Sequence, residues 1–208
     1  MATTTKRKSI IDRSTALSTL EKALHHGSAA IAVAMTDLDD FATLNERHGQ
    51  QAGDEVLVAW EATLDRNLPS DAQAVRVGGD EYLVLLPGLS AENALTFLDE
   101  MRSHFASLDI GSDELRSSAS VGVAANPPHG TTAEDLWRSA SQALMRAKRG
   151  GRDQIAIYVE EKMVLKSNYY SRAGLDRLAK LSAATGRTEA SLLREALDDT
   201  LDKYSDQL

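Results

Sequence analysis

Two short acidic stretches, far apart in the sequence, carry the residue types that bind metal ions and phosphates. The first, RVGGDEYLVLLPG from Arg76, places the acids Asp80 and Glu81 after a Gly-Gly pair at the tip of an expected hairpin. The pair, Gly78 and Gly79, is expected to adopt positive φ and to let a ligand approach the backbone closely. Carboxylate oxygens at such a tip suit a hard cation such as Mg²⁺.

The second stretch, TDLDDF, supplies a further anchor. Asp37 follows the apolar run AAIAVAMTD, at the strand end where ligands usually bind in α/β sheets. If this strand neighbours the hairpin, Asp37 and Asp80 converge on Mg²⁺, whose shell is completed by substrate phosphates. The chemistry indicated is phosphoryl or nucleotidyl transfer. The plainer interpretation of the two residues is a turn carboxylate and a helix cap.

The elements that must position these residues alternate between strand-like and helix-like periodicity. GQQAGDEVL, from Gly49, is expected as a turn that leads into a helix. The order predicts an α/β sandwich, with helices packed on a central sheet. Strands are expected at 29–37, 72–77, 81–87, 117–125 and 154–159, and helices at 54–66, 89–108 and 132–148.

Composition limits the classes of protein. The chain has 208 residues, 42% of them hydrophobic and 26% charged, which is ordinary for a globular protein. No apolar stretch is long enough to span a bilayer, so no membrane partner is expected. The absence of cysteine excludes disulfides and fits a cytoplasmic protein. A net charge of −8 argues against nonspecific coating of nucleic acid.

Four motifs in order carry a resemblance to a known family: DLDDFATLNERHGQQAGDEVL, RVGGDEYLVLL, SASVGVA and ALMRAKRGGRDQ. Through them, residues 12–158 resemble a GGDEF domain, the diguanylate cyclase family. The resemblance implies a domain at 1–159 with a central, mostly antiparallel sheet flanked by helices, as in nucleotidyl cyclases and palm domains. It also implies that two such domains, each holding one GTP, face each other and make cyclic di-GMP and two pyrophosphates.

The resemblance assigns roles to the acidic residues. It implies two Mg²⁺ ions per active site, for which Mn²⁺ can substitute. Their ligands would be the carboxylates of Asp37, Asp80 and Glu81 and the backbone carbonyl of Leu38. Asp80 and Glu81 would be the catalytic residues, with Glu81 helping to deprotonate the attacking 3′-hydroxyl.

The resemblance also implies a nucleotide site. Asn45 and Asp54 would recognise guanine, and Lys148 and Arg152 would hold the triphosphate. On the plainer interpretation, Asn45 caps a loop and the two cations are solvated charges at a helix end. The expected substrate-binding residues are Asn45, Asp54, Gly78, Gly79, Lys148 and Arg152.

The sequence departs from the family pattern at several places. Instead of DxLTGLxNR it has IIDRSTAL, so the opening turn is expected to be shortened or lost. Ala42 stands where the family usually has lysine, and Tyr82 where it usually has phenylalanine. The RxxD of the inhibitory product site is replaced by PSDA at 69–72, so feedback inhibition of that type is not expected.

Residues 160–208 are expected to form a separate module, a short strand followed by two helices. So small a unit cannot bury its own apolar faces and should dimerise. It resembles a ribbon-helix-helix module of the MetJ and Arc kind. One strand register exposes Leu165, Ser167 and Tyr169. The other, which we favour for burial, exposes Lys166, Asn168 and Tyr170, with Lys166 and Asn168 as candidate DNA contacts. From Glu160 onward 8 basic and 9 acidic residues balance, so dimerisation is the safer role.

Three functions therefore remain in view. The first is a diguanylate cyclase that uses GTP and whose C-terminal module supplies a homodimer or higher homo-oligomer. The second is a cyclase of relaxed nucleotide specificity, although Asp54 argues against it. The third is a DNA-binding regulator in which the GGDEF domain senses GTP or a cyclic dinucleotide, although the intact acidic set favours catalysis.

Overall fold

The computed structural model describes residues 10–25, 30–111, 115–160 and 169–204. The chain divides into two compact units, Met1–Glu161 and Lys162–Leu208. In the described ranges, no helix combines the length and the apolar character that crossing a membrane requires.

The first unit is built on a five-stranded sheet in the order β2-β3-β1-β4-β5. The central strand β1 pairs with β3 and β4 in antiparallel fashion, β2 pairs antiparallel with β3, and β4 pairs parallel with β5. The expected sheet flanked by helices is confirmed as a mixed sheet, antiparallel in all pairings but one. The strands are β1 Ile31–Leu38, β2 Gln73–Arg76, β3 Glu81–Pro87, β4 Ala119–Asn126 and β5 Ile155–Ile157.

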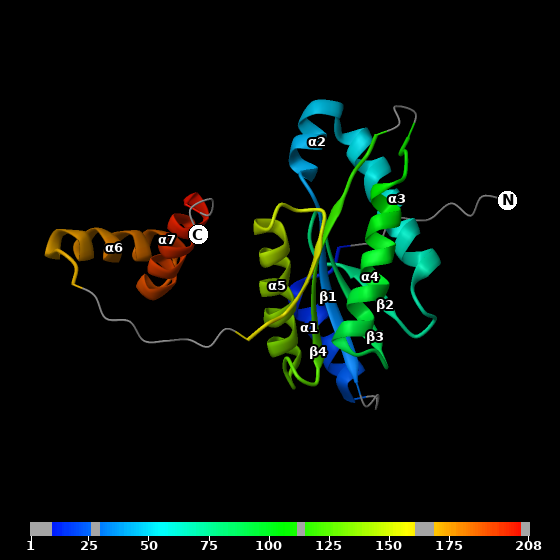
Figure 1. Ribbon diagram of the computed structural model, residues 1–208, viewed down its shortest axis with the longest axis horizontal. Coiled ribbons are helices and arrows are strands. Elements are labelled where there is room, and N and C mark those ends of the chain that lie inside the picture. Colours follow the sequence, from blue (N-terminus) through cyan, green and yellow to red (C-terminus); the bar gives the residue numbers. More distant parts are fainter. Residues whose placement is uncertain (1–9, 26–29, 112–114, 161–168, 205–208) are drawn as a thin grey trace. The chain divides into compact units, whose positions relative to one another are not determined.

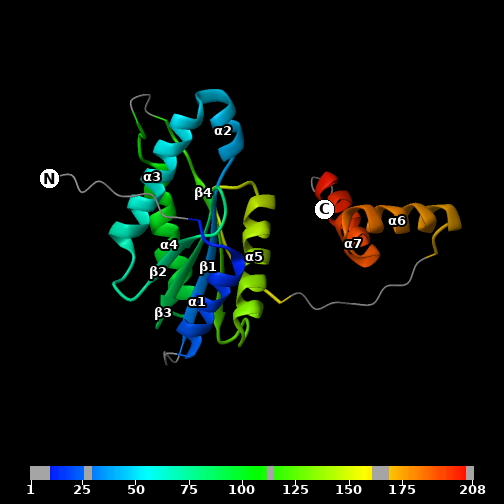
Figure 2. The ribbon, with the colours of Figure 1, turned by 180° about the vertical axis from the view of Figure 1, so that it is seen from behind.

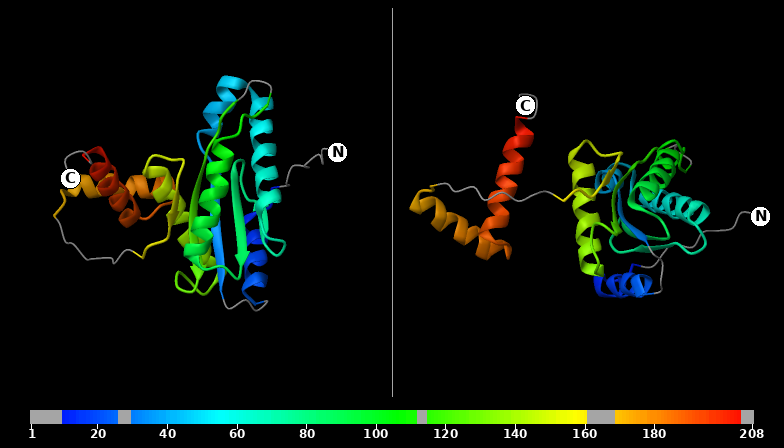
Figure 3. Two further views of the ribbon diagram at one scale, coloured as in Figure 1. Left: turned by 45° about the vertical axis from the view of Figure 1, so that its right-hand side comes forward. Right: turned by 60° about the horizontal axis from the view of Figure 1, so that its bottom comes forward.

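Helices cover both faces of this sheet (Figures 1 and 3). Side chains alternate along β1, so Val33 and Met35 join the core beneath α1 and α5, whereas Ala32 and Ala34 join the core beneath α3 and α4. The reverse view shows α2 beyond the end of β1 (Figure 2). The helices are α1 Arg13–His25, α2 Phe41–His48, α3 Gln50–Asn67, α4 Ala91–Ala106 and α5 Ala133–Arg149.

One local expectation was wrong, and one helix was not foreseen. The segment from Gly49 is not an extended turn, because α3 begins at Gln50 and Gly49 alone, with φ of 86°, separates it from α2. The glycine at 53, which suggested a turn, lies inside α3. Helix α1 was not foreseen, although Ala16 and Leu20, one turn apart, are its buried residues.

The second unit contains two helices, α6 Arg172–Thr185 and α7 Glu189–Lys203. Ser171 caps α6 by accepting from the Gly174 N–H at 3.1 Å, and Gly186 ends it with φ of 67°. The expected strand and the candidate DNA contacts Lys166 and Asn168 lie outside the described residues. Helix α6 has no buried residue.

Candidate active site

The candidate metal ligands meet at one edge of the sheet. Asp37 is the penultimate residue of β1, and Glu81, the first residue of β3, is its cross-strand partner. The Leu38 N–H donates to the Asp80 carbonyl at 3.3 Å, which brings the backbone of Asp80 beside the end of β1. Pairing of β1 with β3 therefore gathers all four expected residues.

Asp37 is a buried carboxylate in an acidic setting. Its side chain is 8% exposed. Burial, opposed by a hydrogen bond from Lys148 and reinforced by the charges of Asp80 and Glu81, raises the pKa of Asp37 from its ordinary 3.8 to about 6. A cation that approaches Asp37 therefore stabilises its ionised form.

Two cations lie at the same edge. Lys148, in the last turn of α5, places Nζ 2.7 Å from Oδ2 of Asp37. Arg152 lies in the next loop with φ of 62°, and its Nε is 3.4 Å from Oδ1 of Asp40. Lys148 therefore contacts a candidate metal ligand directly, whereas Arg152 contacts Asp40, three residues after Asp37.

The donor set fits Mg²⁺, which takes oxygen ligands and keeps places for substrate phosphates. The oxygens on offer are the carboxylates of Asp37, Asp80 and Glu81 and the carbonyl of Leu38. Within the described ranges, no three histidine or carboxylate side chains form a ready-made metal cluster. The ammonium of Lys148 instead neutralises Asp37.

The expected base-recognition residues lie on successive helices, Asn45 on α2 and Asp54 on α3. Asn45 packs on Gly53 so closely that a Cβ on that glycine would lie 1.9 Å from Asn45 Oδ1. A Cβ at position 53 would displace the amide of Asn45, which here lies next to the residue that precedes Asp54. Asp54 itself is exposed.

The glycine pair of the hairpin does not have the backbone conformation that the sequence predicted. Neither Gly78 nor Gly79 has positive φ. Position 78 has little space for a side chain, because a Cβ there would lie 2.9 Å from Oε2 of Glu81. A Cβ on Gly79 would meet no heavy atom within 4 Å, so the turn is open to an approaching ligand there.

Asp39 is a residue that the sequence reasoning missed. It is 8% exposed and accepts hydrogen bonds from the hydroxyls of Ser118 and Ser120, both at 2.7 Å, and from the Asp153 N–H at 2.9 Å. These bonds tie the end of β1 to β4 and to the loop that carries Arg152. Its place inside TDLDDF was a signal, but its partners are distant in sequence.

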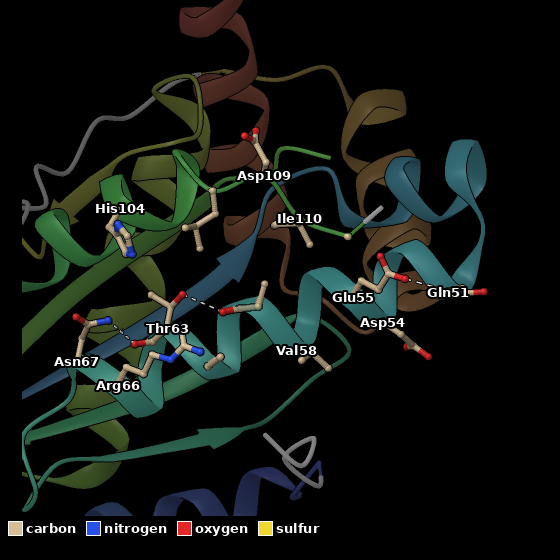
Figure 4. A pocket seen from close by; sticks show the side chains of 14 residues that line it. Gln51, Asp54, Glu55, Val58, Thr63, Arg66, Asn67, His104, Asp109 and Ile110 are labelled. Carbon is tan, nitrogen blue, oxygen red and sulfur yellow. Dashed lines mark hydrogen bonds between the residues drawn. The ribbon is translucent and has the colours of Figure 1, made fainter. Parts of the chain in front are cut away.

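A separate pocket of about 580 Å³ lies on another side of α3 (Figure 4). Asp54, Glu55 and Val58 line it from α3, and His104 and Ile110 line it from the opposite wall. Of the expected site residues it contains Asp54 and none of the others. The pocket is therefore distinct from the acidic cluster at the end of β1.

Comparisons with known proteins agree with this arrangement. Residues 9–154 match the family described as "Diguanylate cyclase, GGDEF domain". The chain is 33% identical over 147 residues to the cyclic di-GMP phosphodiesterase PdeR of Escherichia coli, covering 68% of this chain and 22% of PdeR. It is 32% identical over 135 residues to the diguanylate cyclase DgcP of Pseudomonas aeruginosa, covering 64% and 20%.

A comparison with solved structures also finds a GGDEF domain. The GGDEF domain of DgcB from Caulobacter crescentus, in complex with c-di-GMP, superimposes with a TM-score of 0.65 at 27% identity, covering 76% of this chain and 96% of that one. The chain spans about a fifth of the two curated relatives.

Proposed function

Because the chain belongs to the GGDEF family of diguanylate cyclases, we propose that it condenses two GTP molecules into cyclic di-GMP and releases two pyrophosphates. One observation carries the proposal. Asp37, Asp80 and Glu81 lie at one edge of the sheet, where the phosphate-binding candidates Lys148 and Arg152 contact Asp37 and Asp40 respectively. A domain that merely sensed nucleotide would not need a complete acidic set.

The nucleotide is proposed to lie with its base toward α2 and α3. Asn45 and Asp54 bind guanine there, where a carboxylate accepts from the N1 and N2 donors that adenine lacks. The triphosphate extends toward Lys148 and Arg152, which bind it as a point charge and a planar fork. The backbone of Gly78 and Gly79 lies along the nucleotide. The family's lysine is replaced by Ala42, so this site has one phosphate contact fewer.

The acidic residues are proposed to hold two Mg²⁺ ions, through Asp37, Asp80, Glu81 and the Leu38 carbonyl; Mn²⁺ can substitute. When bound, the metal supplies positive charge that neutralises the phosphate oxygens. Glu81 accepts the proton of the 3′-hydroxyl. The 3′-oxygen then forms a bond to the α-phosphorus of the other GTP, while the bond from that phosphorus to the bridging oxygen breaks and pyrophosphate leaves.

The reaction requires two copies of the domain, because each 3′-hydroxyl attacks the nucleotide held by the other copy. We propose that the C-terminal unit supplies the homodimer as a ribbon-helix-helix module. In support, α6 buries no residue, and both helices expose large apolar side chains that a monomer would leave in water. They include Leu175 and Leu181 of α6 and Leu197 and Leu201 of α7.

Product identification tests the activity. The protein is incubated with Mg²⁺ and GTP, ATP or both, beside Asp80→Ala, and the products are separated and weighed by mass spectrometry. We expect cyclic di-GMP from GTP alone and none from the variant. Products that contain adenine would favour relaxed specificity. Binding of GTP without product, together with nucleotide-dependent retardation of a DNA duplex, would favour the regulator instead.

Sedimentation of the full chain tests the dimer. Leu181→Glu places a charge on the exposed apolar side of α6 and should shift the protein to monomers and lower its activity at low concentration. Ala183→Glu adds the same charge about 200° around that helix and is the matched control. Equal dissociation of both variants, or of neither, would contradict dimerisation through this side.

A further inference from the structure

A buried hydrogen bond links α3 to the strand that carries the acidic motif. Tyr82, which stands where the family usually has phenylalanine, donates its hydroxyl to Oε1 of Glu61 at 2.9 Å. Both residues are 0% exposed. A buried carboxylate is costly unless it is paired and hydrogen-bonded, so Glu61 is expected to have a specific role.

Arg76 completes the network. It is 4% exposed, and its Nη1 lies 4.0 Å from Oε1 of Glu61. On the sheet it is the cross-strand partner of Tyr82, and its guanidinium carbon is 5.9 Å from the centroid of that ring. Side chains from α3, β2 and β3 thus meet in one buried cluster, which we call the Glu61 network: Glu61, Arg76 and Tyr82.

The network holds the turn at Gly78 and Gly79 through the carbonyl groups of these two residues. Arg76 donates from Nε to the Gly78 carbonyl at 3.2 Å and from Nη2 to the Gly79 carbonyl. The peptide bonds that follow these carbonyls are trans. In a trans peptide the N–H points opposite to the C=O, so the N–H groups of Gly79 and Asp80 point away from Arg76.

Those two N–H groups are ready to bind an anion. In the part of the chain that the structure describes, neither donates to an acceptor. The space beside Gly79 is open. Successive backbone N–H groups that point into open space bind anions such as phosphate.

We propose that Glu61 is a positioning residue for the cyclase reaction. Through the Glu61 network it fixes the turn with its carbonyls inward, so that the N–H groups of Gly79 and Asp80 bind the triphosphate. This inference rests on the proposed function, because the anion is the triphosphate of GTP. Glu61 itself touches no substrate and acts through Arg76 and Tyr82.

The first test needs no nucleotide. Glu61→Gln keeps the size of the side chain but removes the charge that holds Arg76. The backbone amide signals of Gly79 and Asp80 in an NMR spectrum of the full chain should shift in this variant. Asp65→Asn removes an exposed carboxylate one turn further along α3 and should leave those signals in place. Unchanged Gly79 and Asp80 signals in Glu61→Gln would overturn the proposal.

The second test compares two ligands by calorimetry. One is a GTP analogue with a methylene between the α- and β-phosphorus atoms, which cannot release pyrophosphate, and the other is guanosine. Loss of hydrogen bonds to a charged group should weaken analogue binding in Glu61→Gln about tenfold. Guanosine binding should not change. If the affinities for both ligands fall equally, the variant is generally damaged and the proposal is overturned. The proposal is also overturned if neither affinity changes.

Two further outcomes keep the inference separate from the proposed function. If the natural protein binds the analogue but makes no cyclic di-GMP, the cyclase proposal fails while the ratio of the two affinities still tests Glu61. If it binds guanosine and the analogue equally well, the triphosphate contact is overturned. Should Glu61→Gln not fold, Tyr82→Phe removes one donor at nearly constant volume, and the same ratio should fall severalfold.

Discussion

Replacing Lys148 with methionine should strengthen metal binding and weaken nucleotide binding. Nζ of Lys148 lies 2.7 Å from Oδ2 of Asp37, whose side chain is 8% exposed. A metal ion that binds Asp37 must displace this ammonium or tolerate its charge. Methionine keeps the apolar stem of the side chain without the charge, so the competition disappears while the proposed phosphate contact is also lost.

The size of the effect follows from the geometry. A hydrogen bond between charged groups contributes about 1.5–3 kcal/mol. Lys148 is 34% exposed, so solvent reduces this to about 1–2 kcal/mol, which is about 5- to 30-fold in affinity. The hydrogen bond from Lys148 lowers the pKa of Asp37, so the pKa rises in the variant. Measurement at about pH 8 keeps Asp37 ionised in both proteins.

The assay separates the two affinities. Mn²⁺ binding is followed by electron paramagnetic resonance without nucleotide, and binding of the methylene GTP analogue is followed at saturating metal. Arg146→Met removes an exposed positive charge from the same end of α5 and should change neither affinity greatly. Equal or weaker Mn²⁺ binding in Lys148→Met would refute the competition between lysine and metal.

Four other predictions concern the candidate site and the residues that support it. Metal affinity should fall about tenfold per pH unit below about 6, because the raised pKa of Asp37 means that protons compete there. The same shift makes the folded state bind more protons between pH 3.8 and about 6, so Asp37 lowers the free energy of unfolding as pH rises through that window. Gly53→Ala should weaken guanosine binding, measured by calorimetry, since the new Cβ would lie 1.9 Å from Asn45 Oδ1. Asp39→Ala should lower the free energy of unfolding in urea by about 3 kcal/mol, because three donors lose their acceptor.

The sequence was informative where the signal was local. Strand alternation and the turn residues of RVGGDEYLVLL predicted the hairpin. As expected, β2 and β3 lie on either side of Gly78 and Gly79. To predict that the hairpin pairs with the first strand, it was enough to assume that two apolar segments are neighbours in the sheet. The sequence could therefore place Asp37 near Asp80 on the condition that the strand and the hairpin are neighbours, and the pairing of β1 with β3 meets that condition.

Long-range partners could not be predicted in this way. The hydroxyl that bonds Glu61 comes from Tyr82, which the sequence analysis identified only as a departure from the family's usual phenylalanine. The donors to Asp39 lie 79 to 114 residues further along the chain. Composition shows that a carboxylate is present, but only the packing of α3 on the sheet and the pairing of β4 with β1 show that it is buried and hydrogen-bonded.

Helix α3 connects the two ends of the proposed nucleotide site. Asp54, the proposed base contact, and Glu61, the anchor of the glycine turn, are seven residues apart, which is about two helical turns or about 10 Å along the axis. Both are carried by one continuous helix whose inner face is held by Val56, Leu57 and Trp60. A rigid helix therefore fixes the distance between base recognition and phosphate binding, so that a base seated at Asp54 presents its phosphates to an already oriented turn. Changes that loosen the packing of α3 should accordingly reduce turnover without removing any residue that touches the substrate.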